Sequence, residues 1–290
     1  MTILDEIVTY KRQVELPKRK ETASPATVQA QAVLSPESRD FVAALQVRPL
    51  AGKGAKGVAL IAEVKKASPS KGLLRPKFDP VDLACTYVRY GASAVSVLTD
   101  AKYFQGELEF IPQIQAALQP ERQKRGITAP VLRKDFIIDP YQVYEAKLAG
   151  ADALLLIAAC LNDKELADLL DRTRQVGLTA LLEVHTKAEL ERVLPLRPRL
   201  VGVNNRNLHD FSVDLRTCID LRQYVPADIC FVAESGIHSR ADVQRLAKEG
   251  VDAILVGEAL VRQKDVGAKV RELSHVTLAE VGLSGQGTYL

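Results

Sequence analysis

Eight short apolar runs, separated by segments with helical periodicity, constrain the fold of this chain most strongly. Continuous apolar runs of this length are typical of parallel strands that are buried on both faces. Strict alternation of strand and helix predicts a parallel sheet. Eight such units in a chain of 290 residues favour a (β/α)8 TIM barrel with an N-terminal helical extension. The runs cover residues 58–64, 94–98, 130–134, 153–159, 179–184, 199–204, 230–234 and 253–257.

A repeated phrase supports the barrel. A glycine, a small spacer and the start of an apolar run recur at residues 91–95, 150–154 and 250–254. Each glycine can end a helix just before a strand, so the phrase indicates a recurrent helix–strand unit. A doubly wound sheet is the alternative. It usually has fewer strands, and the glycine fingerprint that it carries after its first strand is missing here.

Three regions are expected along the chain: an N-terminal helical extension and linker over 1–57, a catalytic barrel over 58–273 and a tail over 274–290. Within the extension, residues 3–16 are predicted to form an amphipathic helix. The polar stretch 17–36 is predicted to be a loop or a loosely docked segment, and 38–47 a short helix. The G-x-G-x-x-G match at 52–57 precedes a strand instead of following one. It therefore indicates a flexible basic linker, not a dinucleotide site.

Composition excludes several classes of function. The net charge of +3 favours anionic ligands but is too small to indicate nucleic-acid binding. The four cysteines and four histidines lack metal-site spacing, so no metal is expected. No signal peptide and no apolar stretch of about 20 residues is present. We therefore expect a cytoplasmic protein that does not contact a membrane.

Polar and ionisable side chains stand at or just beyond the ends of the apolar runs. Burying such groups is costly unless they are paired, and the carboxyl ends of parallel strands are where ligands bind. Lysines that face glutamates suit general acid–base catalysis. A salt bridge that ties strand ends together is the alternative for any single residue. The set comprises Glu63, Lys65, Thr99, Asp100, Lys134, Asp135, Cys160, Glu183, Asn204, Asn205, Arg206, Glu234, Ser235, Gly236, Gly257 and Glu258.

The loops after the last two strands are candidates for phosphate binding. In such barrels these loops often hold phosphate on backbone N–H groups. Here they contain Ser235, Gly236, Gly257 and Glu258, and the glycines let backbone approach an anion closely. Ser68, after the first strand, could add a hydroxyl donor. An ordinary turn would have a similar sequence.

Five segments together resemble the indole-3-glycerol-phosphate synthase family. The resemblance runs in order from about residue 58 to the last predicted strand, and the N-terminal helix resembles that family's extension. The Lys-Asp-Phe and Asn-Asn-Arg motifs in one chain are specific, because related phosphate-binding barrels lack the set. The segments are IAEVKKASPS at 61–70, LRKDF at 132–136, LEVH at 182–185, VNNRNL at 203–208 and AESGI at 233–237.

The resemblance implies a ring closure. In the family's reaction an aromatic carbon of 1-(2-carboxyphenylamino)-1-deoxyribulose 5-phosphate attacks the ketone, and CO2 and then water leave. The product is indole-3-glycerol phosphate, a step of tryptophan biosynthesis. No cofactor is implied, since no redox chemistry occurs and an amine can deliver the proton. The implied partner is this small phosphorylated substrate, and the protein is expected to be a monomer or weak homo-oligomer.

The resemblance also implies roles for residues. Lys134 would be the general acid and Glu183 the base, with Lys65 assisting and Glu63 holding the lysines. Substrate contacts would come from Ser68, Phe136, Asn204, Arg206 and Glu234, and phosphate contacts from Ser235, Gly236, Gly257 and Glu258.

The chain departs from the family pattern in three places. Asn207 stands where the family commonly has Asp, and Glu258-Ala259-Leu260 replaces a Ser-containing loop. Residues 115–129 are expected to be a solvent-facing insertion away from the strand ends. Two other functions remain open at this point: a Schiff-base, aldolase-like enzyme that uses Lys134 as nucleophile, and a barrel that binds a sugar phosphate without catalysis.

Overall fold

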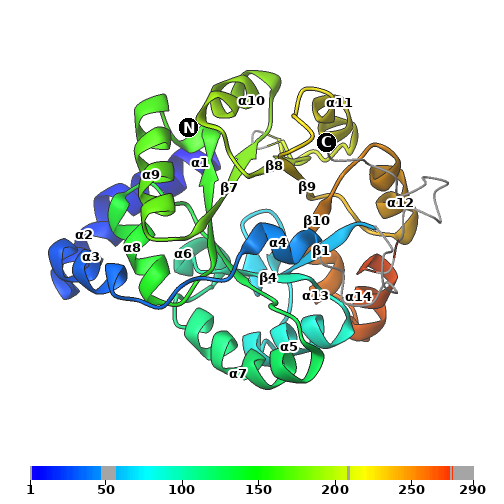
Figure 1. The fold of residues 1–290 in the computed structure, drawn as a ribbon, viewed down its shortest axis with the longest axis horizontal. Helices are drawn as coiled ribbons and strands as arrows, with labels where there is room; N and C mark the ends of the chain where they lie inside the picture. The colour runs from blue at the N-terminus through cyan, green and yellow to red at the C-terminus, as the bar shows by residue number, and fades with distance from the viewer. Residues whose placement is uncertain (1, 47–56, 208–209, 275, 277–290) are drawn as a thin grey trace.

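Each of the eight apolar runs forms a strand, and the strands close into one parallel barrel in the computed structural model of the chain (Figure 1). The structure describes residues 2–46, 57–207, 210–274 and 276. β1 closes the barrel between β4 and β10, with Ala59 opposite Ala253. The (β/α)8 barrel predicted from the sequence is confirmed. The strands are β1 (Ala59–Val64), β4 (Ala94–Leu98), β5 (Val131–Lys134), β6 (Ala153–Ile157), β7 (Thr179–Val184), β8 (Leu200–Asn204), β9 (Cys230–Glu234) and β10 (Ala253–Val256).

Helices follow the strands and cover the outside of the barrel (Figure 1). Their starts are specified locally: Asp79 and Asp139 each cap a helix that begins with proline, and their side chains accept hydrogen bonds from the first-turn N–H groups. The helices are α5 (Pro80–Tyr90), α6 (Ala101–Phe104), α7 (Phe110–Arg125), α8 (Pro140–Leu148), α9 (Asp163–Gln175), α10 (Lys187–Val193), α11 (Arg216–Arg222), α12 (Arg240–Lys248), α13 (Glu258–Val261) and α14 (Val266–Ser274). Shorter elements are a β2–β3 hairpin (Ala67–Ser68 and Gly72–Leu73) and two 3₁₀ turns (Ala158–Cys160 and Leu194–Leu196).

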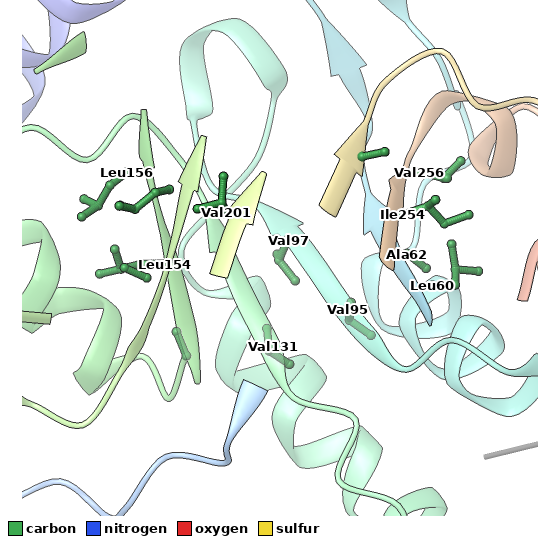
Figure 2. Close-up of a cluster of buried hydrophobic side chains, with 14 of the residues drawn as sticks. Leu60, Ala62, Val95, Val97, Val131, Leu154, Leu156, Val201, Ile254 and Val256 are labelled. Carbon is green, nitrogen blue, oxygen red and sulfur yellow. The ribbon is translucent and has the colours of Figure 1, made fainter. Parts of the chain in front are cut away.

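The two-residue period of the strands divides the core into two layers. Side chains such as Leu60, Val95 and Leu154 point outward and pack under the helices (Figure 2). The alternate residues, including Ile61 and Leu155, fill the barrel interior. α4 (Phe41–Gln46) contributes Phe41, Val42 and Leu45 to this interior cluster, against the first residues of several strands. It therefore closes the amino end of the barrel and leaves the carboxyl end open.

The N-terminal extension differs from the prediction. The predicted first helix is α1 (Ile3–Tyr10) followed by a π-helical turn (Lys11–Glu15). The stretch 17–36 is mostly helical and docks on α8, so the loop alternative is wrong. It forms α2 (Leu16–Thr22) and α3 (Pro25–Val33). The Ser24 side chain caps α3, and Val28 and Ala32 are buried where α3 packs on α8. With so few apolar positions, the segment has little periodicity of its own.

Charged contacts hold these helices on the barrel. The Arg19 guanidinium lies 2.8 Å from the Glu145 carboxylate, and Lys20 Nζ lies 2.8 Å from Asp139 Oδ2. Both acidic partners belong to α8 or its cap. Arg19 and Lys20, two polar residues of the predicted loop, therefore attach α2 to α8 and its cap.

Residues 115–129 are only partly solvent-facing. Residues 115–125 are the second half of α7, in which Leu118 is fully buried, and Arg122 donates to the carbonyls of Thr128 and Ala129. The segment leads into the amino end of β5, away from the carboxyl ends of the strands. Positions 52–56 of the glycine motif and the tail 282–287 lie outside the described residues. In the described helices, none is long and apolar enough to cross a membrane.

Candidate active site at the carboxyl end of the barrel

The last inward-facing position of five of the eight strands carries the candidate chemistry. β1 places Ala59 and Ile61 inside the barrel, and the same face continues to Glu63. By the same alternation, Lys134, Glu183, Asn204 and Glu234 follow interior residues of β5, β7, β8 and β9. The barrel geometry therefore gathers these side chains into one polar layer above the apolar interior.

Lys134 lies at the centre of this layer. Its Nζ is 3.0 Å from Glu183 Oε2 and 3.5 Å from Glu234 Oε2. Only 14% of the Lys134 side chain is exposed, and both carboxylates are buried. A single ammonium group thus lies between two acids in a site that excludes most solvent.

The two acids are driven to opposite protonation states. Burial raises the pKa of Glu183, but the charge of Lys134 and then that of His185 lower it, so its pKa lies below the ordinary range. Burial, and then the negative charge of Glu183, hold the pKa of Glu234 above its ordinary range. Environments that separate the pKa values of neighbouring carboxyl groups mark acid–base assignments. Glu183 is the ionised member of the pair.

Lys134 stays protonated in this environment. Burial lowers the pKa of its ammonium group, but Glu183, Glu234 and then Glu63 raise it above the ordinary value. A charged amine can donate a proton, whereas a Schiff-base nucleophile has to be neutral. The arrangement therefore favours the acid role over the aldolase-like alternative.

Glu63 and Lys65 form a second pair beside the first. Lys65 Nζ lies 2.5 Å from Glu63 Oε2. Gly257, at the end of β10, leaves room for this pair: a Cβ at residue 257 would collide with Glu63 Oε2 and approach Lys65 Nζ to 2.9 Å. A glycine at residue 257 thus leaves the space that the Glu63–Lys65 pair occupies.

One pocket brings together the residues to which the family resemblance gives a role, whereas the strand-end candidates Thr99, Asp100, Cys160 and Asn205 do not line it. Its walls include the apolar side chains of Ile3, Leu4 and Ile7 from α1, so the N-terminal helix lies over the site. Phe104, Phe136 and Phe211 add aromatic walls, and the Phe104 and Phe136 ring centroids are 6.1 Å apart. The thirteen predicted site residues that line the pocket are Glu63, Lys65, Ser68, Lys134, Phe136, Glu183, Asn204, Arg206, Glu234, Ser235, Gly236, Gly257 and Glu258.

The N-terminal helix is fixed over the pocket by a buried lysine. Lys11 lies in the π-helical turn after α1 and is completely buried. Its Nζ is 2.7 Å from Asp135 Oδ1 and 3.1 Å from Asp100 Oδ2, and these two acids follow the ends of β5 and β4. π-Helical turns are frequent at functional sites. The π-helical turn therefore places the Lys11 ammonium beside the polar layer at the strand ends.

Asp135 is also held from below by Arg133. Arg133 points away from the barrel interior, and its guanidinium is 3.0 Å from Asp135 Oδ2. Burial raises the pKa of Asp135, but Lys11 and then Arg133 lower it well below the ordinary range. Asp135 is consequently an ionised structural residue between Lys134 and Phe136.

The loop after β9 has a backbone suited to anion binding. Ser235 and Gly236 have φ values of +66° and +77°, both in the left-handed region. A non-glycine residue in this region is strained, and such strain clusters at ligand sites. A Cβ at Gly236 would collide with Val213 Cγ1 from the loop after β8. Successive residues of this kind can turn N–H groups toward one anion.

Asn204 and Arg206 form a chain of contacts across the pocket, from Glu183 on β7 to Glu258 after β10. The Asn204 side chain donates to Glu183 Oε1 at 3.2 Å and accepts from the Arg206 N–H at 3.0 Å. Arg206 lies 3.9 Å from the Glu258 carboxylate, which also pairs with Arg262 at 3.0 Å. Because that carboxylate would repel phosphate, Glu258 is suited to contribute only its N–H group.

The sequence reasoning missed several residues of the site. The sequence indicates the apolar face of α1 but not that this face lines the pocket. Lys11 has the sequence context of a surface lysine, and nothing in the sequence around His185 indicates that it lies 3.4 Å from Glu183. Among the described residues, no cluster of three His, Cys, Asp or Glu side chains could hold a metal ion.

Comparison with known proteins agrees with this geometry. A family model described as indole-3-glycerol phosphate synthase matches residues 4–273. An indole-3-glycerol phosphate synthase of Roseiflexus sp. is 49% identical over 276 residues, covering 94% of this chain and 98% of that protein. One from Polaromonas sp. is 46% identical over 271 residues, covering 93% and 97%.

Solved structures support the fold. Thiamine phosphate pyrophosphorylase from Pyrococcus furiosus superposes with a TM-score of 0.55 at 18% identity, over 77% of this chain and 96% of that one. At this identity the likeness concerns the barrel alone. The family model and the curated relatives carry the assignment, and the chain belongs to the indole-3-glycerol phosphate synthase family.

Proposed function

We propose that Lys134 and Glu183 are the acid and base with which this barrel closes the indole ring. The substrate is 1-(2-carboxyphenylamino)-1-deoxyribulose 5-phosphate, and the product is indole-3-glycerol phosphate. The observation that carries the assignment is the contact of 3.0 Å between the Lys134 ammonium and the ionised Glu183 carboxylate at the base of the pocket. It joins a proton donor and a proton acceptor in one solvent-poor layer.

Lys134 acts first. Its ammonium protonates the ketone oxygen while the aromatic carbon that bears the carboxylate attacks the ketone carbon. The carbon–carboxylate bond then breaks, and its electron pair restores the aromatic ring as CO2 leaves. A positioned acid of this kind typically contributes a factor of about 10²–10⁴.

Glu183 acts in the dehydration. It removes a proton from the methylene carbon next to nitrogen while the hydroxyl leaves as water. Lys65 assists as an acid or as an electrostatic clamp, and Glu63 holds it through their contact of 2.5 Å. Glu234, kept neutral by burial and by Glu183, can donate a hydrogen bond to the substrate.

The rest of the pocket orients the substrate. Phe136 and the α1 residues Ile3, Leu4 and Ile7 offer apolar walls for the anthranilate ring. Asn204 can hydrogen-bond a substrate hydroxyl. At the opposite wall, the N–H groups of Ser235, Gly236 and Gly257 would hold the phosphate, aided by Ser68 and Arg206.

A direct assay tests this proposal. The purified protein is incubated with the anthranilate-derived ribulose phosphate, and indole fluorescence is followed. The chain has no Trp, so its background is low. Rising fluorescence is expected. Borohydride added during turnover should trap no covalent adduct on Lys134; a trapped adduct would instead support the aldolase-like alternative.

We further propose that the enzyme works as a monomer or weak homo-oligomer in the cytoplasm. The support is that all thirteen candidate residues line a pocket formed by one chain. Sedimentation analysis during turnover checks the oligomeric state: activity per chain should not change with protein concentration. Cell fractionation checks the location.

A further inference from the structure

A row of ionisable side chains leads from Lys134 to a second cavity. Lys134 Nζ is 3.0 Å from Glu183 Oε2, and the other oxygen, Glu183 Oε1, is 3.4 Å from His185 Nε2. His185 Nδ1 is in turn 3.3 Å from Glu189 Oε2. β7 supplies Glu183, His185 follows the last residue of that strand, and Glu189 lies on α10.

Exposure increases along this row. The side chains of Glu183, His185 and Glu189 are 3%, 10% and 17% exposed. His185 and Glu189 line the second cavity, which shares Leu4, Asn204 and Arg206 with the catalytic pocket. Asp5 and Thr186, on its wall, are exposed to solvent. The row therefore connects the buried base with a water-accessible space beside the main pocket.

The imidazole is oriented for proton transfer. Glu189 Oε2 accepts a hydrogen bond from the His185 backbone N–H at 2.7 Å and also lies next to Nδ1. This contact favours a proton on Nδ1 and directs Nε2 toward Glu183. Within the described residues, buried Nε2 has no hydrogen-bond partner. Catalytic contacts are often long in the unliganded site and tighten with substrate.

The proposed reaction needs such a route. The substrate carboxylate leaves as neutral CO2, and the ketone oxygen leaves as water after gaining two protons. Only one proton returns to the enzyme, from the methylene carbon. Each turnover therefore draws one proton from solvent, while the substrate covers the pocket that holds Lys134.

Building on the proposed function, we propose that His185 is a positioning residue that supplies this proton to Lys134 through Glu183. After ring closure Lys134 is neutral. The His185 imidazolium gives its proton from Nε2 to Glu183 Oε1, and Glu183 passes a proton from Oε2 to Lys134 Nζ. Glu183 is ionised again for the dehydration, and neutral His185 takes up a proton from water in the second cavity.

The charges around His185 support an imidazolium. Burial lowers its pKa, but Glu189 and Glu183 raise it above the ordinary value, against a smaller opposing effect of Lys134. The second cavity adds Asp5 from α1, and Arg206 and Asp214 from the loop after β8. The Cys160 thiol, also near Glu183 and Glu189, has a raised pKa because of burial and stays neutral.

Two variants test the route. His185→Asn keeps a donor toward Glu189 but cannot carry a proton, and Glu189→Gln removes the charge that stabilises the imidazolium. We expect kcat to fall about ten- to a hundredfold in His185→Asn and less in Glu189→Gln, with KM changed less than about threefold. Glu191→Gln is the matched control, because Glu191 is 65% exposed on the same helix and should leave kcat unchanged.

The pH profile separates proton supply from simple packing. Because His185 must be protonated to act, kcat of the parent enzyme should fall as pH rises through the pKa of His185. This fall of kcat, the alkaline limb of the pH profile, should disappear in His185→Asn. A variant that keeps both the parent kcat and this limb overturns the proposal.

Chemical rescue gives the decisive comparison. In His185→Ala, added imidazole should restore kcat at least fivefold, and the rescue should grow with the concentration of its protonated form. Loss of kcat without rescue by imidazole or smaller amines would assign His185 a purely structural role and overturn the proposal. The proposed function fails separately, if the parent enzyme itself does not turn over the ribulose phosphate.

Discussion

Lys11 Nζ and Asp135 Oδ1 lie 2.7 Å apart, and both side chains are completely shielded from solvent. The contact joins the N-terminal extension to the residue that follows Lys134, the proposed acid. The same ammonium reaches Asp100 after β4 at 3.1 Å, so one cation fixes two neighbouring strand ends. The α1 residues that wall the pocket depend on this anchor for their position.

Lys11→Met should destabilise the protein strongly. Methionine fills a similar volume but leaves Asp100 buried without its cation and Asp135 with Arg133 alone, and breaking a buried pair costs about 3–5 kcal/mol. Urea unfolding at pH 7 measures the change in free energy. Lys18→Met is the control, because Lys18 lies on the exposed side of α2. Equal stability of the two variants would show that Lys11 contributes no net anchoring.

The loss caused by Lys11→Met should depend on pH in a defined direction. In the parent protein the pKa of Asp135 is lowered by Lys11 and Arg133, so its contribution is present above about pH 4 and is lost as pH falls further. Without Lys11, Asp135 keeps only Arg133 as a cationic partner, so less stability is lost when its carboxylate is protonated. The difference from the parent should therefore be larger at pH 7 than at pH 4.5. The opposite order would contradict this account.

The sequence was sufficient for the barrel and for the position of many polar residues at its strand ends, for a physical reason. Parallel strands buried on both faces produce long apolar runs, and a charged residue such as Lys134 or Glu183 stands out at the end of such a run. Alternation then determines which side faces the interior. These signals are local in the chain.

What the sequence could not show depends on partners far away in the chain. Lys11 resembles a surface residue until Asp135, more than a hundred positions away, is placed beside it. α2 and α3 lack a strong apolar face; charged residues of α2 dock on α8 and its cap, and α3 packs on α8 through Val28 and Ala32. His185 gains significance only from the cavity that Glu189 and the loop after β8 form around it.

Lys134→Ala should retain the fold and lose turnover. The barrel core does not use this side chain, and removal of a positioned acid should lower kcat by about 10²–10⁴. Circular dichroism and the fluorescence assay measure the two effects. A fall in kcat of less than about tenfold would exclude Lys134 from the acid role.

Glu183→Gln should affect turnover more than binding. Glutamine preserves the shape and can still contact Asn204, which is 3.2 Å from Glu183 Oε1. It cannot accept the proton, and it no longer stabilises the Lys134 charge. We expect kcat to fall about a hundredfold or more, with KM within about threefold. If affinity collapses while kcat persists, Glu183 is a binding residue and the base lies elsewhere.

Gly236→Ala should weaken phosphate binding without disturbing the lysines. Its φ of +77° disfavours any side chain, and a Cβ would collide with Val213 from the neighbouring loop, so the N–H groups at Ser235 and Gly236 should shift. Inorganic phosphate should compete with substrate about tenfold less well than in the parent. Gly257 is unsuited to this test, since a Cβ there would displace Glu63 and Lys65 and change kcat as well. Gly177→Ala provides the matched control: φ is +72° with open space around it, at the end of α9 and away from the pocket. Equal competition by phosphate in the two variants, at parent strength, would place the anion outside the loop after β9.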